Sequence, residues 1–211
     1  MAVTDVRLEQ NRAFGGIIDI FEATGIEYVI WGGVAAVAYG EPRFTQDMDV
    51  LVRLHYDQVD TLTRLLEEDG YYVSVEAVRE ALERHFYFNA IHLETGVKID
   101  FCVAGPDPIY AWAFEHRQVK GFDEFRQASY MPPESVILFK LLAYQEGHST
   151  RHLDDIEGIL RVSGPELDLT YVDRVAARIG VLGTWRESLE KSGLRRRFAH
   201  PLGKGGDDSE A

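Results

Sequence analysis

Apolar residues recur with two different periods before Pro132, which predicts a mixture of helices and strands. A helix is expected over Val6 to Thr24, where apolar side chains follow the i, i+3, i+4, i+7 spacing and Gly25 supplies the stop. Further helices are expected at Val34–Tyr39, Tyr56–Glu68 and Glu76–Arg84. Strands are expected at Tyr28–Trp31, Met48–Arg53, Tyr71–Val75, Phe86–Leu93, Val97–Val103 and Gln127–Met131. The stretch from residue 104 to residue 130 has the least regular pattern, apart from the strand expected near its end.

After Pro132-Pro133 the spacing of apolar residues is helical only. The expected helices are Glu134–Glu146, Arg151–Val162, Leu169–Ile179 and Thr184–Lys191. We therefore predict an α/β domain over residues 1–131 and a helical C-terminal domain over residues 132–198. The glycine- and acid-rich composition of residues 199–211 predicts a disordered tail.

Composition narrows the class of protein. The chain has 211 residues, of which 45% are hydrophobic and 27% charged, as is ordinary for a soluble globular protein. No apolar run approaches the roughly 20 residues of a membrane span, and the polar N-terminus lacks a signal-peptide core. We therefore expect a cytoplasmic protein with no membrane association. Cys102 is the only cysteine, which excludes an internal disulfide.

Candidate chemistry lies in three places. Gly32-Gly33 follows an apolar strand and offers a turn where backbone N–H groups can approach a phosphate. Asp47 and Asp49 are two residues apart in a strand and so share one face of the sheet. Asp100 lies between apolar neighbours in a second strand, where a carboxylate needs compensation. An Asp-x-Asp pair alone occurs often by chance, but three acids on strands of one sheet are better explained by a shared cation.

Together, these segments resemble the signature of the polymerase-beta-like nucleotidyltransferase superfamily. The resemblance rests on Gly32-Gly33, the interval 34–46, Asp47-Met48-Asp49 and Ile99-Asp100-Phe101. The finer pattern Gly40-x-x-Arg43-x-Thr45-x-Asp47-x-Asp49 resembles minimal bacterial nucleotidyltransferases, including AbiE-like abortive-infection toxins. The resemblance implies an α+β nucleotidyltransferase fold, with a mixed central sheet flanked by helices and a helical C-terminal portion.

The same resemblance implies roles for individual residues. Asp47, Asp49 and Asp100 would be the catalytic, metal-binding carboxylates for Mg²⁺ or Mn²⁺. The nucleoside triphosphate, for which ATP is one candidate, would be bound by Gly32, Gly33, Arg43, Thr45 and Lys140. Many relatives have serine after the first glycine, whereas this chain continues with Gly33 and Val34, so that only backbone donors are left for the phosphates. A surface pair of Arg43 with Glu41 is the structural alternative.

The helical half contributes further candidates. Lys140 lies in a helix that is apolar almost all round, so it either snorkels to the surface or faces a polar site. Arg151, His152 and Asp155 fall on one side of the next helix, and this stretch also resembles the helical extension of the minimal nucleotidyltransferases. The alternative is a solvated face with a weak Arg151–Asp155 surface pair. A cation site of His148 and His152 is allowed by spacing, although hard oxygen ligands already serve the metal. The basic run Arg195-Arg196-Arg197 is interpreted as a solvated tail.

These observations predict a nucleotidyltransferase that moves a nucleoside monophosphate from a triphosphate to an acceptor hydroxyl with release of pyrophosphate. The net charge of −13, from 22 basic and 35 acidic residues, argues against a uniformly basic nucleic-acid-binding face. The acceptor stays open between a small molecule, a tRNA and a protein. One alternative is a tRNA-modifying toxin held in check by a partner antitoxin. Another is a catalytically silent nucleotide-binding or interaction module on the same fold.

Overall fold

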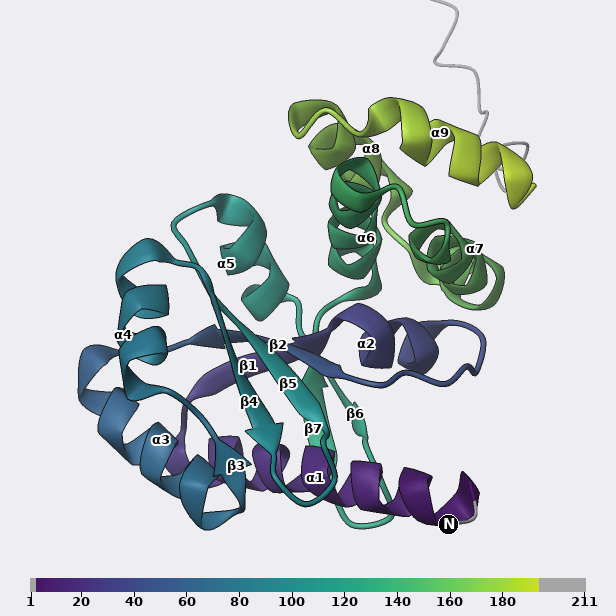
Figure 1. The fold of residues 1–211 in the computed structure, drawn as a ribbon. Coiled ribbons are helices and arrows are strands. Elements are labelled where there is room, and N and C mark those ends of the chain that lie inside the picture. The colour runs from purple at the N-terminus through teal and green to yellow at the C-terminus, as the bar shows by residue number, and fades with distance from the viewer. Residues whose placement is uncertain (1–2, 194–211) are drawn as a thin grey trace, which may run out of the picture.

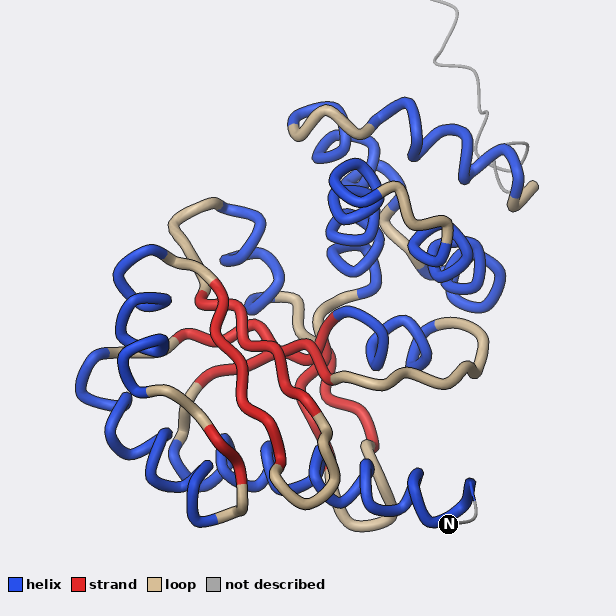
Figure 2. The backbone as a smooth tube through the Cα atoms, in the orientation of Figure 1, coloured by secondary structure: helices blue, strands red, loops and turns tan. Residues whose placement is uncertain are grey.

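The structure of the protein is a computed structural model that describes residues 3–193, with side chains from Leu8 onward. The expected tail over residues 199–211 and the basic run at residues 195–197 lie outside the described residues. Figure 2 shows the strands gathered at the centre of the molecule, with helices around them and above them. Among the described residues, no helix has both the length and the apolar character needed to cross a membrane.

Helices and strands alternate as far as Tyr130, and helices follow. The helices are α1 (Val3–Thr24), α2 (Gly32–Tyr39), α3 (Val59–Glu68), α4 (Val75–Arg84), α5 (Pro108–Glu115), α6 (Pro133–Gly147), α7 (Arg151–Ser163), α8 (Leu169–Arg178) and α9 (Leu182–Lys191). Short 3₁₀ turns span Tyr56–Gln58 and Gly164–Glu166. The strands are β1 (Glu27–Trp31), β2 (Met48–Arg53), β3 (Tyr71–Tyr72), β4 (Tyr87–His92), β5 (Lys98–Val103), β6 (Gln118–Gly121) and β7 (Gln127–Tyr130).

The strands form one mixed sheet in the order β3-β4-β5-β2-β1-β7-β6. At its centre β2 pairs with β5 in parallel and with β1 in antiparallel orientation. The hairpin of β4 and β5 is antiparallel, and β1 pairs in parallel with β7. The α+β class with a mixed central sheet is therefore confirmed.

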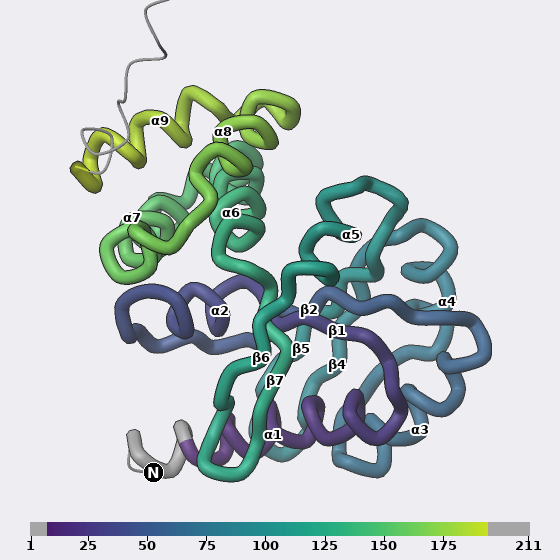
Figure 3. Tube along the Cα trace, turned by 180° about the vertical axis from the view of Figure 1, so that it is seen from behind, coloured from purple at the N-terminus to yellow at the C-terminus, as the bar shows by residue number. Residues whose placement is uncertain are grey.

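The two faces of the sheet are covered differently. Buried apolar side chains such as Val50, Phe101 and Phe88 point to one face, where Phe21 of α1 meets Phe101 edge to face. Helices α1, α3 and α4 cover that face (Figure 1). Because strand side chains alternate, Asp49 and Asp100 point to the opposite face. Helices α5 and α6 lie on the side of that face (Figures 1 and 3), and Asp49 and Asp100 are both half-buried.

Most expected elements are present, with one strand overextended. The strand expected at Tyr71–Val75 ends at Tyr72, because the Ser74 side chain accepts a hydrogen bond from the Ala77 N–H and starts α4 at Val75. The irregular stretch after residue 104 contains α5 and β6, which the sequence pattern did not predict. Within the described residues only helices follow β7, and the division into two domains at residue 132 stays a prediction.

Candidate active site

A row of four side chains crosses the accessible face of the sheet. Asp49 on β2 lies opposite Asp100 on the parallel neighbour β5. The row continues from Asp49 to Trp31 on β1 and from Asp100 to Asn89 on β4. Register partners share one face, so the strand pairing brings two of the three predicted carboxylates side by side. Asp47 immediately precedes β2, and its charge acts on Asp49.

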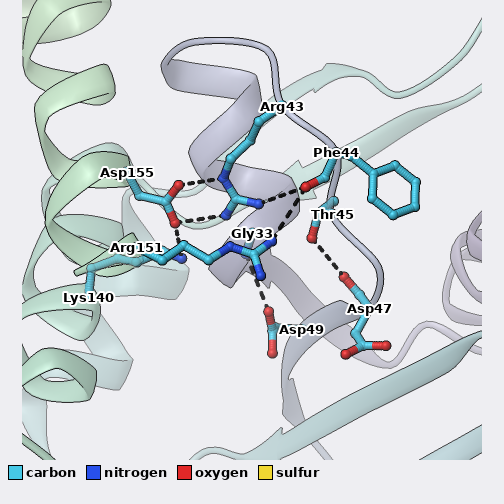
Figure 4. Close-up of polar contacts among 9 residues, drawn as sticks. All are labelled: Gly33, Arg43, Phe44, Thr45, Asp47, Asp49, Lys140, Arg151 and Asp155. Carbon is cyan, nitrogen blue, oxygen red and sulfur yellow. Dashed lines mark hydrogen bonds and ion pairs between the residues drawn. The ribbon is translucent and has the colours of Figure 1, made fainter. Parts of the chain in front are cut away.

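The two glycines form the turn from β1 into α2 at the end of this row. Gly32 has a φ of +60°, and a Cβ atom on it would come 1.8 Å from Asp49 Oδ2. A Cβ atom on Gly33 would come 2.4 Å from Thr45 Oγ1 and 3.3 Å from Arg43 Nη2. The turn is thus kept free of side chains by the carboxylate on one side and by the 40–47 loop on the other. The Gly33 N–H donates to Asp49 Oδ2 at 3.3 Å (Figure 4).

Gly32→Ala is expected to disrupt the site more than the backbone strain alone explains. The matched control is Gly25→Ala, since Gly25 has a φ of +66° and nothing within 4 Å of its Cβ position. Both changes should destabilise by about 1–3 kcal/mol through the left-handed backbone. Only Gly32→Ala should also displace Asp49 and lower nucleotide binding. Urea unfolding and calorimetric triphosphate titration of both variants measure the difference, and equal triphosphate binding would contradict the assignment.

Asp49 experiences opposing electrostatic effects. Burial raises its pKa to about 6; the Gly33 hydrogen bond and the Lys140 charge lower it, and Asp100 and Asp47 raise it again. A carboxylate in this position is poorly compensated at neutral pH, and a bound cation would relieve it. This observation, together with the set of hard oxygen donors, fits Mg²⁺ or Mn²⁺.

Opposite the carboxylates, a buried ion network joins the 40–47 loop to α6 and α7. Arg43 donates from Nε to Asp155 Oδ1 at 2.5 Å and from Nη2 to Oδ2 at 2.8 Å. Lys140 Nζ lies 2.6 Å from the same Oδ2. The Asp155 side chain is 3% exposed and the Lys140 side chain 8% exposed. Burial raises the pKa of Asp155, but the hydrogen bonds and charges of Arg43 and Lys140 outweigh it and hold the pKa below its ordinary value.

Two arginines converge on one carbonyl beside this network. Arg43 Nη1 donates to the Phe44 carbonyl at 3.0 Å, and Arg151 Nη2 reaches the same oxygen at 3.4 Å (Figure 4). His152 has a buried Nδ1 without a hydrogen-bond partner. Burial and then the Lys140 charge lower the pKa of His152 below its ordinary value. Lys140, Arg43 and Arg151 together form a group of positive charges that faces the glycine turn. These three residues are called the cationic wall below.

Asp100 has a cationic partner on its own strand. Lys98 Nζ lies 2.7 Å from Asp100 Oδ2. The hydrogen bond from Lys98 to Asp100 and the charges of Asp100, Asp47 and Asp49 raise the pKa of Lys98, which outweighs the lowering by burial. Within residues 3–193, no three His, Cys, Asp or Glu side chains are already arranged around a common metal position. In this arrangement Asp49 accepts from the Gly33 N–H, and Asp100 pairs with Lys98.

Contacts join several of the sequence-predicted candidates: Gly33 bonds to Asp49, Thr45 bonds to Asp47, and Arg43 and Lys140 both pair with Asp155. The structure also overturns three alternatives. Lys140 does not snorkel to the surface. Asp155 forms no surface pair with Arg151. Glu41 pairs with Arg161 and not with Arg43. His148 ends α6 with a left-handed backbone, and its ring packs against Tyr144.

Sequence reasoning missed two contributors. Gln10 on α1 is buried and donates from Nε2 to the carbonyls of Thr45 and Gln46 at 2.9 and 2.7 Å, which holds the loop that carries Arg43. No local signal marks it, because it is one polar residue on a long helix. Lys98 had a signal, since strand alternation puts it on the same face as Asp100. Thr45 Oγ1, expected at the nucleotide, donates to the Asp47 carbonyl at 3.3 Å.

No protein-family profile matches the sequence, and no curated protein sequence matches it. Solved structures do match the arrangement of elements. The solution structure of the antibiotic-resistance factor ANT(2'')-Ia matches with a TM-score of 0.56 and 15% identity, over 90% of this chain and 97% of that one. An antigenic nucleotidyltransferase-like protein from Paracoccidioides brasiliensis matches with a TM-score of 0.56 and 16% identity, over 91% of this chain and 93% of that one. The chain has the nucleotidyltransferase fold.

A crystal structure of ANT(2'')-Ia in complex with adenylyl-2''-tobramycin also matches, with a TM-score of 0.53 and 16% identity over 83% of this chain. Within the nucleotidyltransferase fold of this chain, the glycine turn comes from β1–α2 and the paired carboxylates come from β2 and β5, while the cationic wall combines the 40–47 loop with α6 and α7. The site therefore depends on the fold as a whole and on no single segment.

Proposed function

We propose that the protein is a metal-dependent nucleotidyltransferase that transfers a nucleoside monophosphate from a nucleoside triphosphate to an acceptor hydroxyl and releases pyrophosphate. The observation that carries the proposal is the pairing of Asp49 with Asp100 across β2 and β5, next to a turn that excludes side chains. The cationic wall on the other side supplies positive charge for a polyphosphate. A negatively charged row, an open turn and a positively charged wall together are the components that phosphoryl transfer needs.

Each part of the site has a role in this reaction. Asp47, Asp49 and Asp100 would hold Mg²⁺ or Mn²⁺, which when bound neutralises the charge of the reacting phosphates. The backbone N–H groups at the start of α2 would bind phosphate oxygens. Lys140, Arg43 and Arg151 would orient the triphosphate, and the planar fork of arginine suits phosphate geometry. Asp100 faces the side on which the acceptor hydroxyl would approach, away from the cationic wall.

For the donor and acceptor, we propose ATP and a small-molecule hydroxyl. Support comes from the fold neighbour ANT(2'')-Ia, which is seen in complex with adenylyl-2''-tobramycin. The resemblance to AbiE-like toxins favours instead a tRNA or protein acceptor and an antitoxin partner. The experiment therefore includes a tRNA, and a cell extract that contains candidate protein acceptors. The product that carries the nucleotide identifies the acceptor class.

We expect pyrophosphate release from a nucleoside triphosphate that requires Mg²⁺ or Mn²⁺ and is lost in Asp47→Asn. The measurement combines a coupled pyrophosphate assay with an α-labelled triphosphate, tested on aminoglycosides, tRNA and cell extract. Asp154→Asn on the exposed side of α7 is the matched control and should keep full activity. Equal release by the wild type and Asp47→Asn, or no release and no labelled product with any acceptor, would refute the proposed function.

A further inference from the structure

Lys98 lies beside the row of side chains that contains Asp49 and Asp100. It lies two residues before Asp100 on β5, so both side chains point to the same face of the sheet. Its Nζ lies 2.7 Å from Asp100 Oδ2, while its side chain is still 38% exposed. The pair is therefore built into the strand and is reached from solvent on the side away from the cationic wall.

The ammonium of Lys98 is the positive charge closest to the third carboxylate. Lys140 is tied to Asp155 on the other side of the site, and Arg43 is tied to the same carboxylate. Charge interactions with Asp47 and Asp49 also reach Lys98, although neither forms an ion pair with it. A divalent cation at Asp100 would have to displace this ammonium or sit beside it, and like charges a few ångströms apart repel.

We propose that Lys98 supplies at Asp100 the positive charge that a second divalent cation supplies in a two-metal site, so that the protein takes up a single divalent cation with its nucleotide, at Asp47 and Asp49. This inference rests on the proposed function and refines its metal site. Lys98 acts through Asp100: it neutralises the carboxylate and fixes its orientation on the acceptor side. The flexible four-carbon stem of lysine lets the ammonium follow the carboxylate as substrates bind.

The test counts bound cations rather than turnover. Mn²⁺ is titrated into the full chain in the presence of a non-hydrolysable ATP analogue, with bound Mn²⁺ followed by calorimetry and by electron paramagnetic resonance. The wild type should bind one Mn²⁺ per protein–nucleotide complex. Lys98→Met and Lys98→Gln should bind two. Their affinity for the second Mn²⁺ should be at least about tenfold higher than any residual affinity of the wild type for a second ion.

Two further variants separate charge at this position from charge in general. Lys98→Arg keeps the cation and should bind one Mn²⁺. Lys191→Met removes the same charge from the exposed end of α9, far from the sheet (Figure 1), and should also bind one. The inference would be overturned if the wild type bound two Mn²⁺, or if Lys98→Met and Lys98→Gln each bound only one. If pyrophosphate is still released in that case, the proposed function stands. Absence of Mn²⁺ binding in the wild type would overturn both.

Discussion

Asp49→Asn is expected to lower nucleotidyl transfer by at least about 10²- to 10³-fold, the range seen when one charge-stabilising group is removed from an active site. Asp49 lies opposite Asp100 in the strand register, and its side chain accepts a hydrogen bond from the Gly33 N–H. The amide keeps the shape of the side chain but cannot carry the negative charge that a cation needs. Pyrophosphate release at saturating triphosphate and Mg²⁺ measures the loss.

The same variant should be more stable than the wild type when metal is absent. The pKa of Asp49 is raised from 3.8 to about 6, so the folded protein binds its proton more tightly than the unfolded chain does. The contribution of Asp49 to the free energy of unfolding therefore falls as the pH rises from about 4 to about 6, and it stays unfavourable above that range. At pH 7 we expect Asp49→Asn to gain about 1–2 kcal/mol.

Urea unfolding of both proteins in EDTA, at pH values from 4 to 8, measures this difference. The gain should be near zero at pH 4 and reach its full value above pH 6. Saturating Mg²⁺ with a triphosphate should reverse the order, because the wild type binds the cation and the variant does not. A gain that does not depend on pH would show that Asp49 is not the titrating group.

Asp155→Ala is expected to destabilise the protein by about 3–5 kcal/mol, the usual result of removing one partner from a buried ion network. The change leaves Arg43 and Lys140 without the carboxylate that they share, in a site where the Asp155 side chain is only 3% exposed. It also removes the Arg43–Asp155 ion pair between the 40–47 loop and α7. Triphosphate affinity should therefore fall together with stability, and urea unfolding and triphosphate titration measure both.

The chain supplies a matched control for this change in the adjacent residue. Asp154 is exposed on the same helical turn, and Asp154→Ala should shift stability by no more than about 0.5 kcal/mol. The double variant Lys140→Met/Asp155→Asn should lose less stability than the sum of its single changes, because no lysine is then left unpaired. Additive losses would argue against the network.

The stabilising effect of Asp155 has the opposite pH dependence to that of Asp49. The pKa of Asp155 is held below its ordinary value, so its contribution to stability is present above about pH 4 and is lost as the pH falls below that value. The difference in stability between the wild type and Asp155→Ala should therefore shrink in acid.

The sequence by itself predicted most of the elements, α5 and β6 excepted, and both strands that carry the paired carboxylates. Hydrophobic spacing predicted β2 and β5. The prediction also put Asp47 in the strand with Asp49, whereas β2 begins one residue later, at Met48. The glycine pair marked the turn into α2, since a φ of +60° at Gly32 favours a residue without a side chain. These features are local, because each depends on residues that are close together in the sequence.

Only the tertiary structure decided how these parts meet. The register of β2 against β5 pairs Asp49 with Asp100, and the packing of α6 and α7 on α2 brings Asp155 to Arg43, far along the chain. A buried carboxylate between two cations could not be told from a surface pair by helical spacing, because spacing defines a helix face but not what covers it. The partners of Asp155 and Gln10 were set by contacts between elements, and those contacts turn separate polar residues into one site.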